Sequence, residues 1–357
     1  MKSLGNFPDP FIAEIAGQPD AVRRAGAAAI DQSGLLEAAA APGRLGRIAL
    51  SGMGSSYDAC YPASTFLATA GISAPMQDAA DLLHFRLSAL GASDLLVLVS
   101  QSGESAETLG VARALRERPD GAPTIVSVTN GVANTLAGLA DVPLDTRAGE
   151  ETGPSTMTFA AALTMLGALA RAVAGEEIPA AVATNAREAD RVATAIEDLV
   201  VDGHLPEHLA SWHGGRATTV ILGRGTGRAA AEMGALTVKE AVGMPIEALQ
   251  TAQFRHGPLE LAGPELAAIV IATEPETAEL DRSLAEDLLA LGSGVLFITA
   301  AGSVPEGATS IDVGSLDRLV CPAASIVPIQ LLAWRLSVEA GRSPGSYVHA
   351  TKVTKRE

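Results

Sequence analysis

The chain has 357 residues, of which 48% are hydrophobic and only 3% aromatic, and its formal net charge is −16. A chain of this length buries enough aliphatic surface for two domains of ordinary size. The negative charge argues against nucleic acid and anionic membranes as partners, and the scarcity of aromatic residues argues against a platform that stacks bases. Two isolated cysteines, Cys60 and Cys321, predict reduced thiols and a cytoplasmic location.

Helical patterns open the chain at 9–41 and recur at 180–203, and between them apolar strands alternate with helices. The strands expected in the first half lie at 47–51, 74–77, 95–99, 124–129 and 141–144. The helices expected there lie at 57–70 and 79–90, after strand 95–99 as far as Glu117, and at 155–174. Such alternation predicts an α/β fold with doubly wound, mainly parallel sheets flanked by helices in three α/β/α layers.

The second half of the chain repeats the first at an almost constant spacing. The matching pairs, at offsets of 170 or 171, are Gly54 and Gly225, Pro75 and Pro245, Asp94 and Glu265, and Ile125 and Val295. Four elements in one order at one spacing predict two similar α/β domains. The expected division is a helical lead-in at 1–39, a first domain at 40–175, a helical connector at 176–211, a second domain at 212–345 and a tail at 346–357.

The buried strand at 95–99 ends abruptly in hydroxyl residues around one glycine. Ser100, Ser102, Ser105 and Thr108 crowd this turn and the helix start that follows it. Unpaired N–H groups and the helix dipole favour an anion at such a place, whereas a generic turn with an N-cap serine is the alternative. The second copy has carboxylates at the equivalent loop, 271–277, and no glycine. Only the first domain is therefore expected to bind an anion.

Two features of the second half could carry proton transfer. In the helix expected at 229–243, Glu232 and Glu240 share one stripe, and Glu240 stands in the last turn against the negative end of the dipole. A carboxylate beside an apolar wall suits a general base, and a solvated glutamate paired with Lys or Arg is the alternative. His256 precedes a Gly-Pro turn that leaves it at a loop tip, where a plain surface histidine is the alternative.

The string Gly52-Met53-Gly54-Ser55-Ser56 follows the first strand but lacks the third glycine of a dinucleotide fingerprint, so no nucleotide cofactor is expected. The basic tail could fold Lys352 over the site as a cation, and a frayed, solvated end is the alternative.

Together, the Ser-Gln-Ser-Gly-Glu-Ser string at 100–105, the helix that carries Glu240, the His256 loop and the Lys352 tail resemble the double-SIS (sugar isomerase) domain family of phosphosugar isomerases. The similarity is to the isomerase domain of glucosamine-6-phosphate synthases and to SIS-type glucosamine-6-phosphate deaminases, and it extends from about 11 to 352. It implies two tandem SIS domains. It also implies that the phosphosugar is bound by Ser55, Ser56, Ser100, Gln101, Ser102, Ser105 and Ser155.

The resemblance implies catalytic roles for three residues. Glu240 would move a proton between C1 and C2, His256 would reach in from the neighbouring subunit to assist ring opening, and Lys352 would line the site. A homodimer that shares its site between subunits is therefore expected. No metal and no organic cofactor is expected, because proton transfer beside a carbonyl needs only an acid and a base.

Two lysines of the family pattern are missing, because Thr237 and Met157 stand in their places. The chain also starts where the isomerase half would, without an N-terminal cysteine nucleophile, so glutamine is not the expected ammonia source. The expected reaction converts glucosamine 6-phosphate to fructose 6-phosphate and ammonia. The alternatives are a ketosamine (fructosamine) 6-phosphate deglycase and a non-catalytic sugar-phosphate sensor.

Overall fold

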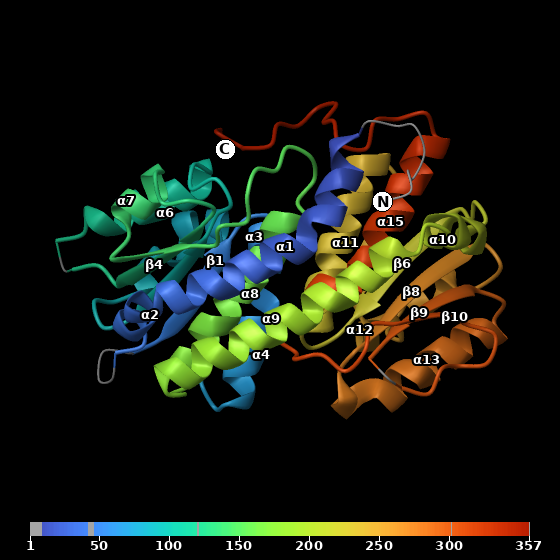
Figure 1. Cartoon of the computed structure of the whole chain (residues 1–357), viewed down its shortest axis with the longest axis horizontal. Coiled ribbons are helices and arrows are strands. Elements are labelled where there is room, and N and C mark those ends of the chain that lie inside the picture. Colours follow the sequence, from blue (N-terminus) through green and yellow to red (C-terminus); the bar gives the residue numbers. More distant parts are fainter. Residues whose placement is uncertain (1–8, 42–45, 120, 301, 357) are drawn as a thin grey trace. The chain divides into compact units, whose positions relative to one another are not determined.

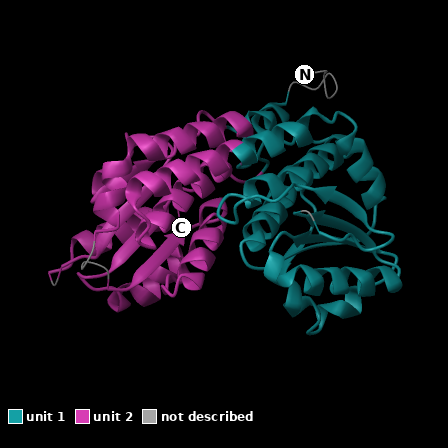
Figure 2. Cartoon of the chain, turned by 60° about the horizontal axis from the view of Figure 1, so that its bottom comes forward, with its two compact units in different colours: residues 1–17, 152–155, 191–348 teal, residues 18–151, 156–190, 349–357 magenta. Residues whose placement is uncertain are grey.

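A computed structural model of the chain describes residues 9–41, 46–119, 121–300 and 302–356. The chain divides into two compact units (Figure 2). One, called here the first-sheet unit, comprises residues 18–151, 156–190 and 349–357. The other, the second-sheet unit, comprises residues 1–17, 152–155 and 191–348.

Each unit is built on a five-stranded parallel sheet, and the two sheets have the same strand order. Figure 1 shows the helices that lie around each sheet. The first runs β2-β1-β3-β4-β5 and the second runs β7-β6-β8-β9-β10. Their strands are β1 Ile48–Gly52, β2 Met76–Asp78, β3 Leu95–Val99, β4 Thr124–Thr129, β5 Val142–Asp145, β6 Thr218–Gly223, β7 Glu247–Gln250, β8 Leu266–Ala272, β9 Gly294–Thr299 and β10 Thr309–Asp312. The predicted fold of two similar parallel α/β domains is confirmed.

The helices before β6 are α1 Pro10–Asp31, α2 Ser33–Ala39, α3 Ser55–Asp58, α4 Cys60–Thr69, α5 Ala79–Asp81, α6 Ala106–Arg116, α7 Thr135–Leu139, α8 Met157–Val173, α9 Ile178–Val201 and α10 Leu205–His213. Those after it are α11 Gly227–Val242, α12 Thr251–Phe254, α13 Ala278–Ala290, α14 Pro322–Ser325 and α15 Val327–Glu339. Short π and 3-10 turns cover Leu82–Arg86, Leu87–Ala89, Pro258–Leu261 and Pro275–Thr277.

The strand at the centre of the first sheet is buried on both faces. All five residues of β3 are buried, as the continuous apolar run predicts. On one face, Leu96 and Leu98 join a core cluster with residues of α6 and α7. On the other, α8 packs against β4 and α4. Helices on both faces leave the ends of the strands as the place where polar groups can gather.

Three expected helices differ from those in the structure. The helix expected at 57–70 begins at Ser55 and is divided into α3 and α4, and the helix expected at 79–90 is a single α-turn continued by π and 3-10 turns. The helix expected from 155 begins at Met157. Glu151 explains this last difference, because its carboxylate binds the N–H groups of Thr156 and Thr158 and so fixes where the helix starts.

The loops that follow β1 and β6 show the repeat at the level of single residues. Gly54 has φ +51° and Gly225 has φ +55°, a left-handed conformation that favours glycine. Their spacing of 171 residues is the offset measured in the sequence. Both halves therefore have a glycine with positive φ at the same place in the turn that leaves the first strand of the sheet.

The buried His213, at the end of α10, is expected to make stability fall in mild acid. Burial, helped by the charge of Arg216, lowers the pKa of His213 below its ordinary 6.5, and its Nε2 lies 3.0 Å from Oγ1 of Thr219. The unfolded chain then binds the proton more readily than the folded one, so the free energy of unfolding decreases as the pH falls below about 6.5. Urea unfolding at pH 7.5 and 5.5 should show a smaller difference in His213→Gln than in the wild type; an equal difference would contradict this assignment.

Both cysteines, Cys60 and Cys321, are free and buried. Burial raises the pKa of Cys321 to about 11 and moves that of Cys60 in the same direction, so neither thiol is activated. Among the described residues, no helix combines the length and the hydropathy that crossing a bilayer requires.

Candidate functional site

The first sheet reverses its strand order between β1 and β3. In parallel sheets of this kind, ligands bind beyond the carboxyl ends of the strands at the point of reversal. The loop after β1 carries Ser55 and Ser56, and the loop after β3 carries Ser100 to Ser105. The two loops that the sequence predicts to bind the ligand therefore follow adjacent strands, one on each side of the reversal.

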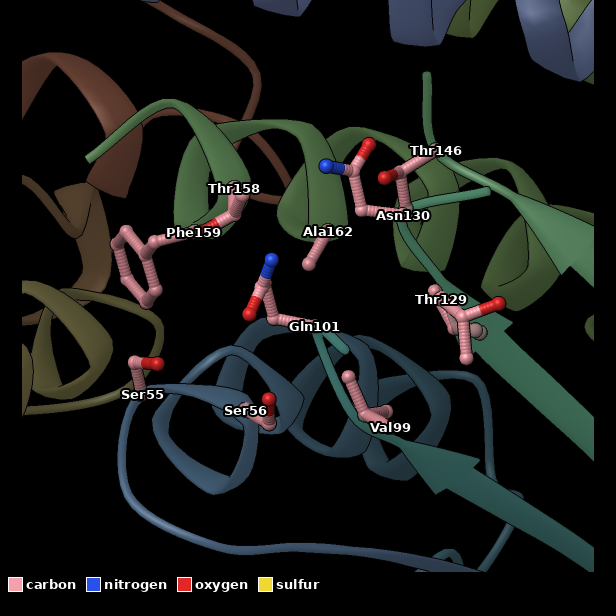
Figure 3. A pocket seen from close by; sticks show the side chains of 11 residues that line it. Ser55, Ser56, Val99, Gln101, Thr129, Asn130, Thr146, Thr158, Phe159 and Ala162 are labelled. Carbon is pink, nitrogen blue, oxygen red and sulfur yellow. The ribbon is translucent and has the colours of Figure 1, made fainter. Parts of the chain in front are cut away.

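A pocket lies at these strand ends and contains about 270 Å³ of space not filled by protein atoms, part of it open to solvent. Figure 3 shows the Gln101 side chain extending into it, with Ser55 and Ser56 on one side and Asn130 and Thr146 on another. The residues that line it are Ser55, Ser56, Val99, Gln101, Val128, Thr129, Asn130, Thr146, Thr158, Phe159 and Ala162. Its lining combines apolar side chains with hydroxyl and amide groups, as in sites for small polar ligands.

Three of the predicted binding residues, Ser55, Ser56 and Gln101, line this pocket. Sequence reasoning missed four polar residues that also line it: Thr129, Asn130, Thr146 and Thr158. The first two stand at the end of β4, and Thr146 follows β5. The sequence signal that could have found Thr129, Asn130 and Thr146 is the one that identified the loop after β3: a polar residue at the end of a buried parallel strand.

The remaining serines organise the loop after β3. The hydroxyls of Ser100 and Ser105 lie 3.2 Å apart, and the Ser102 hydroxyl accepts from the N–H of Glu104 at 3.1 Å. The N–H of Gly103 donates to the carbonyl of Ser100 at 3.2 Å. Ser105 is the residue at which the chain enters α6. The loop therefore gathers three hydroxyls at the N-terminus of a helix, an arrangement that favours an anion.

Glu104 puts a carboxylate into this loop, but its oxygens are bonded elsewhere. Oε1 accepts from the N–H of Thr135 at 2.7 Å, and Oε2 accepts from the hydroxyl of Thr135 at 2.9 Å. These bonds hold the pKa of Glu104 below its usual range. The carboxylate thus joins the loop to the start of α7.

The equivalent place in the second sheet is filled by the protein itself. Glu274, which follows β8, is buried, and its Oε1 accepts from the N–H of Thr226 at 2.7 Å in the loop after β6. Its Oε2 lies 3.3 Å from the guanidinium of Arg318. A side-chain carboxylate thus occupies the donors that would meet an anion there, and repels a second one.

Glu240 lies in the last turn of α11, and its side chain is half-buried. The helix ends at Gly243, which has φ +70° and donates its N–H to the carbonyl of Lys239. Glu232, two turns earlier on the same helix, forms an ion pair with Arg228 at 3.0 Å. Thr237 is fully buried, and its hydroxyl donates to the carbonyl of Met233.

His256 is exposed in the loop after α12. The backbone N–H of His256 donates to the carbonyl of Gln253 at 3.0 Å. Gly257 follows with φ +125° and precedes a 3-10 turn. The structure therefore places the imidazole on an exposed turn. Ser155, the last of the predicted binding residues, lies two positions before α8 and is half-buried.

Lys352 of the tail is bound to a buried carboxylate. Its Nζ lies 2.6 Å from Oε2 of Glu151, whose side chain is fully buried. The same carboxylate accepts from the N–H and the hydroxyl of both Thr156 and Thr158, at the start of α8. The pocket residue Thr158 and the tail lysine therefore share one anchor. Over the described ranges, no cluster of three His, Cys, Asp or Glu side chains could hold a metal ion.

Comparison with known proteins identifies the class. Residues 44–172 and 216–311 match the SIS domain, and the chain belongs to this family. Over 96% of its length it is 28% identical to a glutamine–fructose-6-phosphate aminotransferase (isomerizing) from Pyrobaculum aerophilum, of which it covers 57%. The chain thus spans about half the length of the curated relatives it matches.

Solved structures show the same fold. The C-terminal domain of glucosamine-fructose-6-phosphate aminotransferase from Francisella tularensis aligns with a TM-score of 0.80 and 21% identity, covering 98% of this chain and 99% of that one. Glucosamine-6-phosphate deaminase from Thermotoga maritima aligns with a TM-score of 0.68 and 20% identity, covering 93% of this chain and 99% of that one. The chain is thus a double-SIS protein, similar to the isomerase domain of these aminotransferases.

Proposed function

We propose that this chain is a phosphosugar isomerase and deaminase that converts glucosamine 6-phosphate and water to fructose 6-phosphate and ammonia. The observation that carries the proposal is the polar pocket at the switch point of the first sheet, next to a loop of three hydroxyls at a helix N-terminus. The names of the relatives support the substrate class, since they act on 6-phosphorylated hexoses or hexosamines.

In the proposed reaction, the loop from Ser100 to Ser105 binds the 6-phosphate, and His256 assists opening of the pyranose. Glu240 takes the C2 proton of the open aldehyde, which gives an enolamine, and returns a proton to C1. The resulting C2 imine is hydrolysed by water, which breaks the C2–N bond and releases ammonia. Lys352 stabilises the charge that develops on the carbonyl oxygen. Every step needs only proton transfer and water.

Ammonia release over a panel of 6-phosphorylated hexosamines and fructosamines tests this proposal. We expect glucosamine 6-phosphate to yield ammonia and fructose 6-phosphate in equal amounts, and unphosphorylated glucosamine to yield neither. Release of an intact amino acid from a fructosamine 6-phosphate, without reaction of glucosamine 6-phosphate, would favour the deglycase. The replacement of two lysines by Thr237 and Met157, both buried, favours that second candidate, since a substrate with another amine substituent needs other partners.

We further propose a cytoplasmic homodimer in which His256 serves the site of the partner subunit. The two free thiols support the cytoplasmic location. The exposed position of His256, on a turn, suits a side chain that acts in a neighbouring chain.

Mixing two inactive variants tests the shared site. When Glu240→Gln and His256→Ala chains are co-refolded or co-expressed, each heterodimer should hold one site with both groups intact and one with neither. Random pairing should then restore about a quarter of wild-type turnover, because half of the dimers are heterodimers with half of their sites active. Turnover no higher than that of the separate variants would show that each chain uses its own histidine.

A further inference from the structure

The C-terminal tail is held to the first-sheet unit at two points close together in sequence. Lys352 pairs with Glu151, and the carbonyl of Thr354 accepts a hydrogen bond from the N–H of Ala106 at 3.1 Å. Ala106 is the first residue of α6 and directly follows Ser105 of the hydroxyl loop. The tail backbone is therefore fixed at the helix terminus where that loop ends.

The next residue of the tail brings a positive charge to the loop. Lys355 is exposed. The pKa of Glu104 is lowered mainly by its hydrogen bonds from Thr135, and the positive charges of Lys355 and Arg113 lower it further. The oxygens of Glu104 are already bonded to Thr135. The loop itself, from Ser100 to Ser105, contains no lysine or arginine.

We propose that Lys355 supplies this missing cation and that its ammonium group pairs with the phosphate of the bound phosphosugar. The inference rests on the proposed function. A phosphate bound by hydroxyls in a chain of net charge −16 gains most from a cation fixed nearby. A lysine suits the task because its compact charge sits on a flexible stem, while Thr354 fixes the backbone beside it.

Binding experiments with the full chain test the inference, with Arg356→Ala as the matched control. This control removes the same charge one residue further along the tail. Titration calorimetry with glucosamine 6-phosphate and with inorganic phosphate should show roughly tenfold weaker binding for Lys355→Ala, the loss expected for one charge-assisted contact. Arg356→Ala should stay within about twofold of the wild type. Lys355→Arg should restore most of the affinity.

Two results would overturn the inference: unchanged phosphate affinity in Lys355→Ala, or an equal loss in Lys355→Ala and Arg356→Ala. The second would show a general effect of tail charge. The readout is binding, so it separates this inference from the proposed function. If the wild type binds phosphate and loses it on Lys355→Ala, yet releases no ammonia from any substrate, the inference stands and the proposed reaction fails. If the wild type binds neither ligand, both fail.

Discussion

Glu240→Gln is expected to reduce turnover of glucosamine 6-phosphate by about 10²–10⁴-fold, the usual contribution of general acid–base catalysis. The amide has nearly the shape of the carboxylate but cannot accept the C2 proton. Substrate affinity should stay close to that of the wild type, because the proposed phosphate site lies in the first-sheet unit and does not include Glu240. Steady-state kinetics should therefore show a loss in kcat with little change in KM.

Glu232→Gln is the matched control, because Glu232 lies on the same helix and pairs with Arg228 on the surface of α11. A partly exposed ion pair of this kind contributes little to stability, so turnover should stay within about twofold of the wild type. Wild-type turnover in Glu240→Gln, or an equal loss in both variants, would remove Glu240 from the mechanism.

Gly103→Ala is expected to abolish measurable binding of glucosamine 6-phosphate. Gly103 has φ +66°, and a Cβ there would come within 1.9 Å of Oδ1 of Asn134. That oxygen accepts from the N–H of Ala137 and caps α7, and the Asn134 amide donates to the carbonyl of Gly131. The substitution must therefore displace both Gly103 and Asn134. A left-handed alanine adds about 1–2 kcal/mol of strain.

Gly138→Ala is the control for this change, because Gly138 lies in α7 and, apart from its chain neighbours and the backbone of its own helix, nothing lies within 4 Å of an added Cβ. It should bind substrate as the wild type does and unfold at the same temperature or slightly higher. Circular dichroism should show that Gly103→Ala still folds, so that lost binding reports on the loop. Unchanged affinity in a folded Gly103→Ala would exclude this loop as the phosphate site.

The architecture was predictable because the segments that repeat in the sequence are mainly buried strands. In an α/β protein, an apolar run such as that of β3 predicts a strand buried on both faces of a parallel sheet. The constant spacing between β3 and β8 predicts the second sheet. The hydroxyl loop after β3 was predictable for the same reason, since the end of a buried strand is where polar residues first appear.

Other parts of the site depend on contacts between distant segments. Glu151 binds Lys352, 201 residues later in the chain, and no local pattern announces that pairing. The sequence predicts only that Glu274 would repel an anion, whereas the structure shows its carboxylate hydrogen-bonded to Thr226 in the loop after β6. The start of α8 was placed two residues too early because the cap, Glu151, lies outside the expected helix.

A crystal structure with glucosamine 6-phosphate bound to Glu240→Gln, in the oligomer that forms in solution, tests the central claim most directly. The account predicts the phosphate on the loop from Ser100 to Ser105, with residue 240 within hydrogen-bonding reach of C2 and a His256 side chain at the ring oxygen. Phosphate bound in the second-sheet unit near Glu274, or a sugar ring that neither residue 240 nor any His256 can reach, would contradict it.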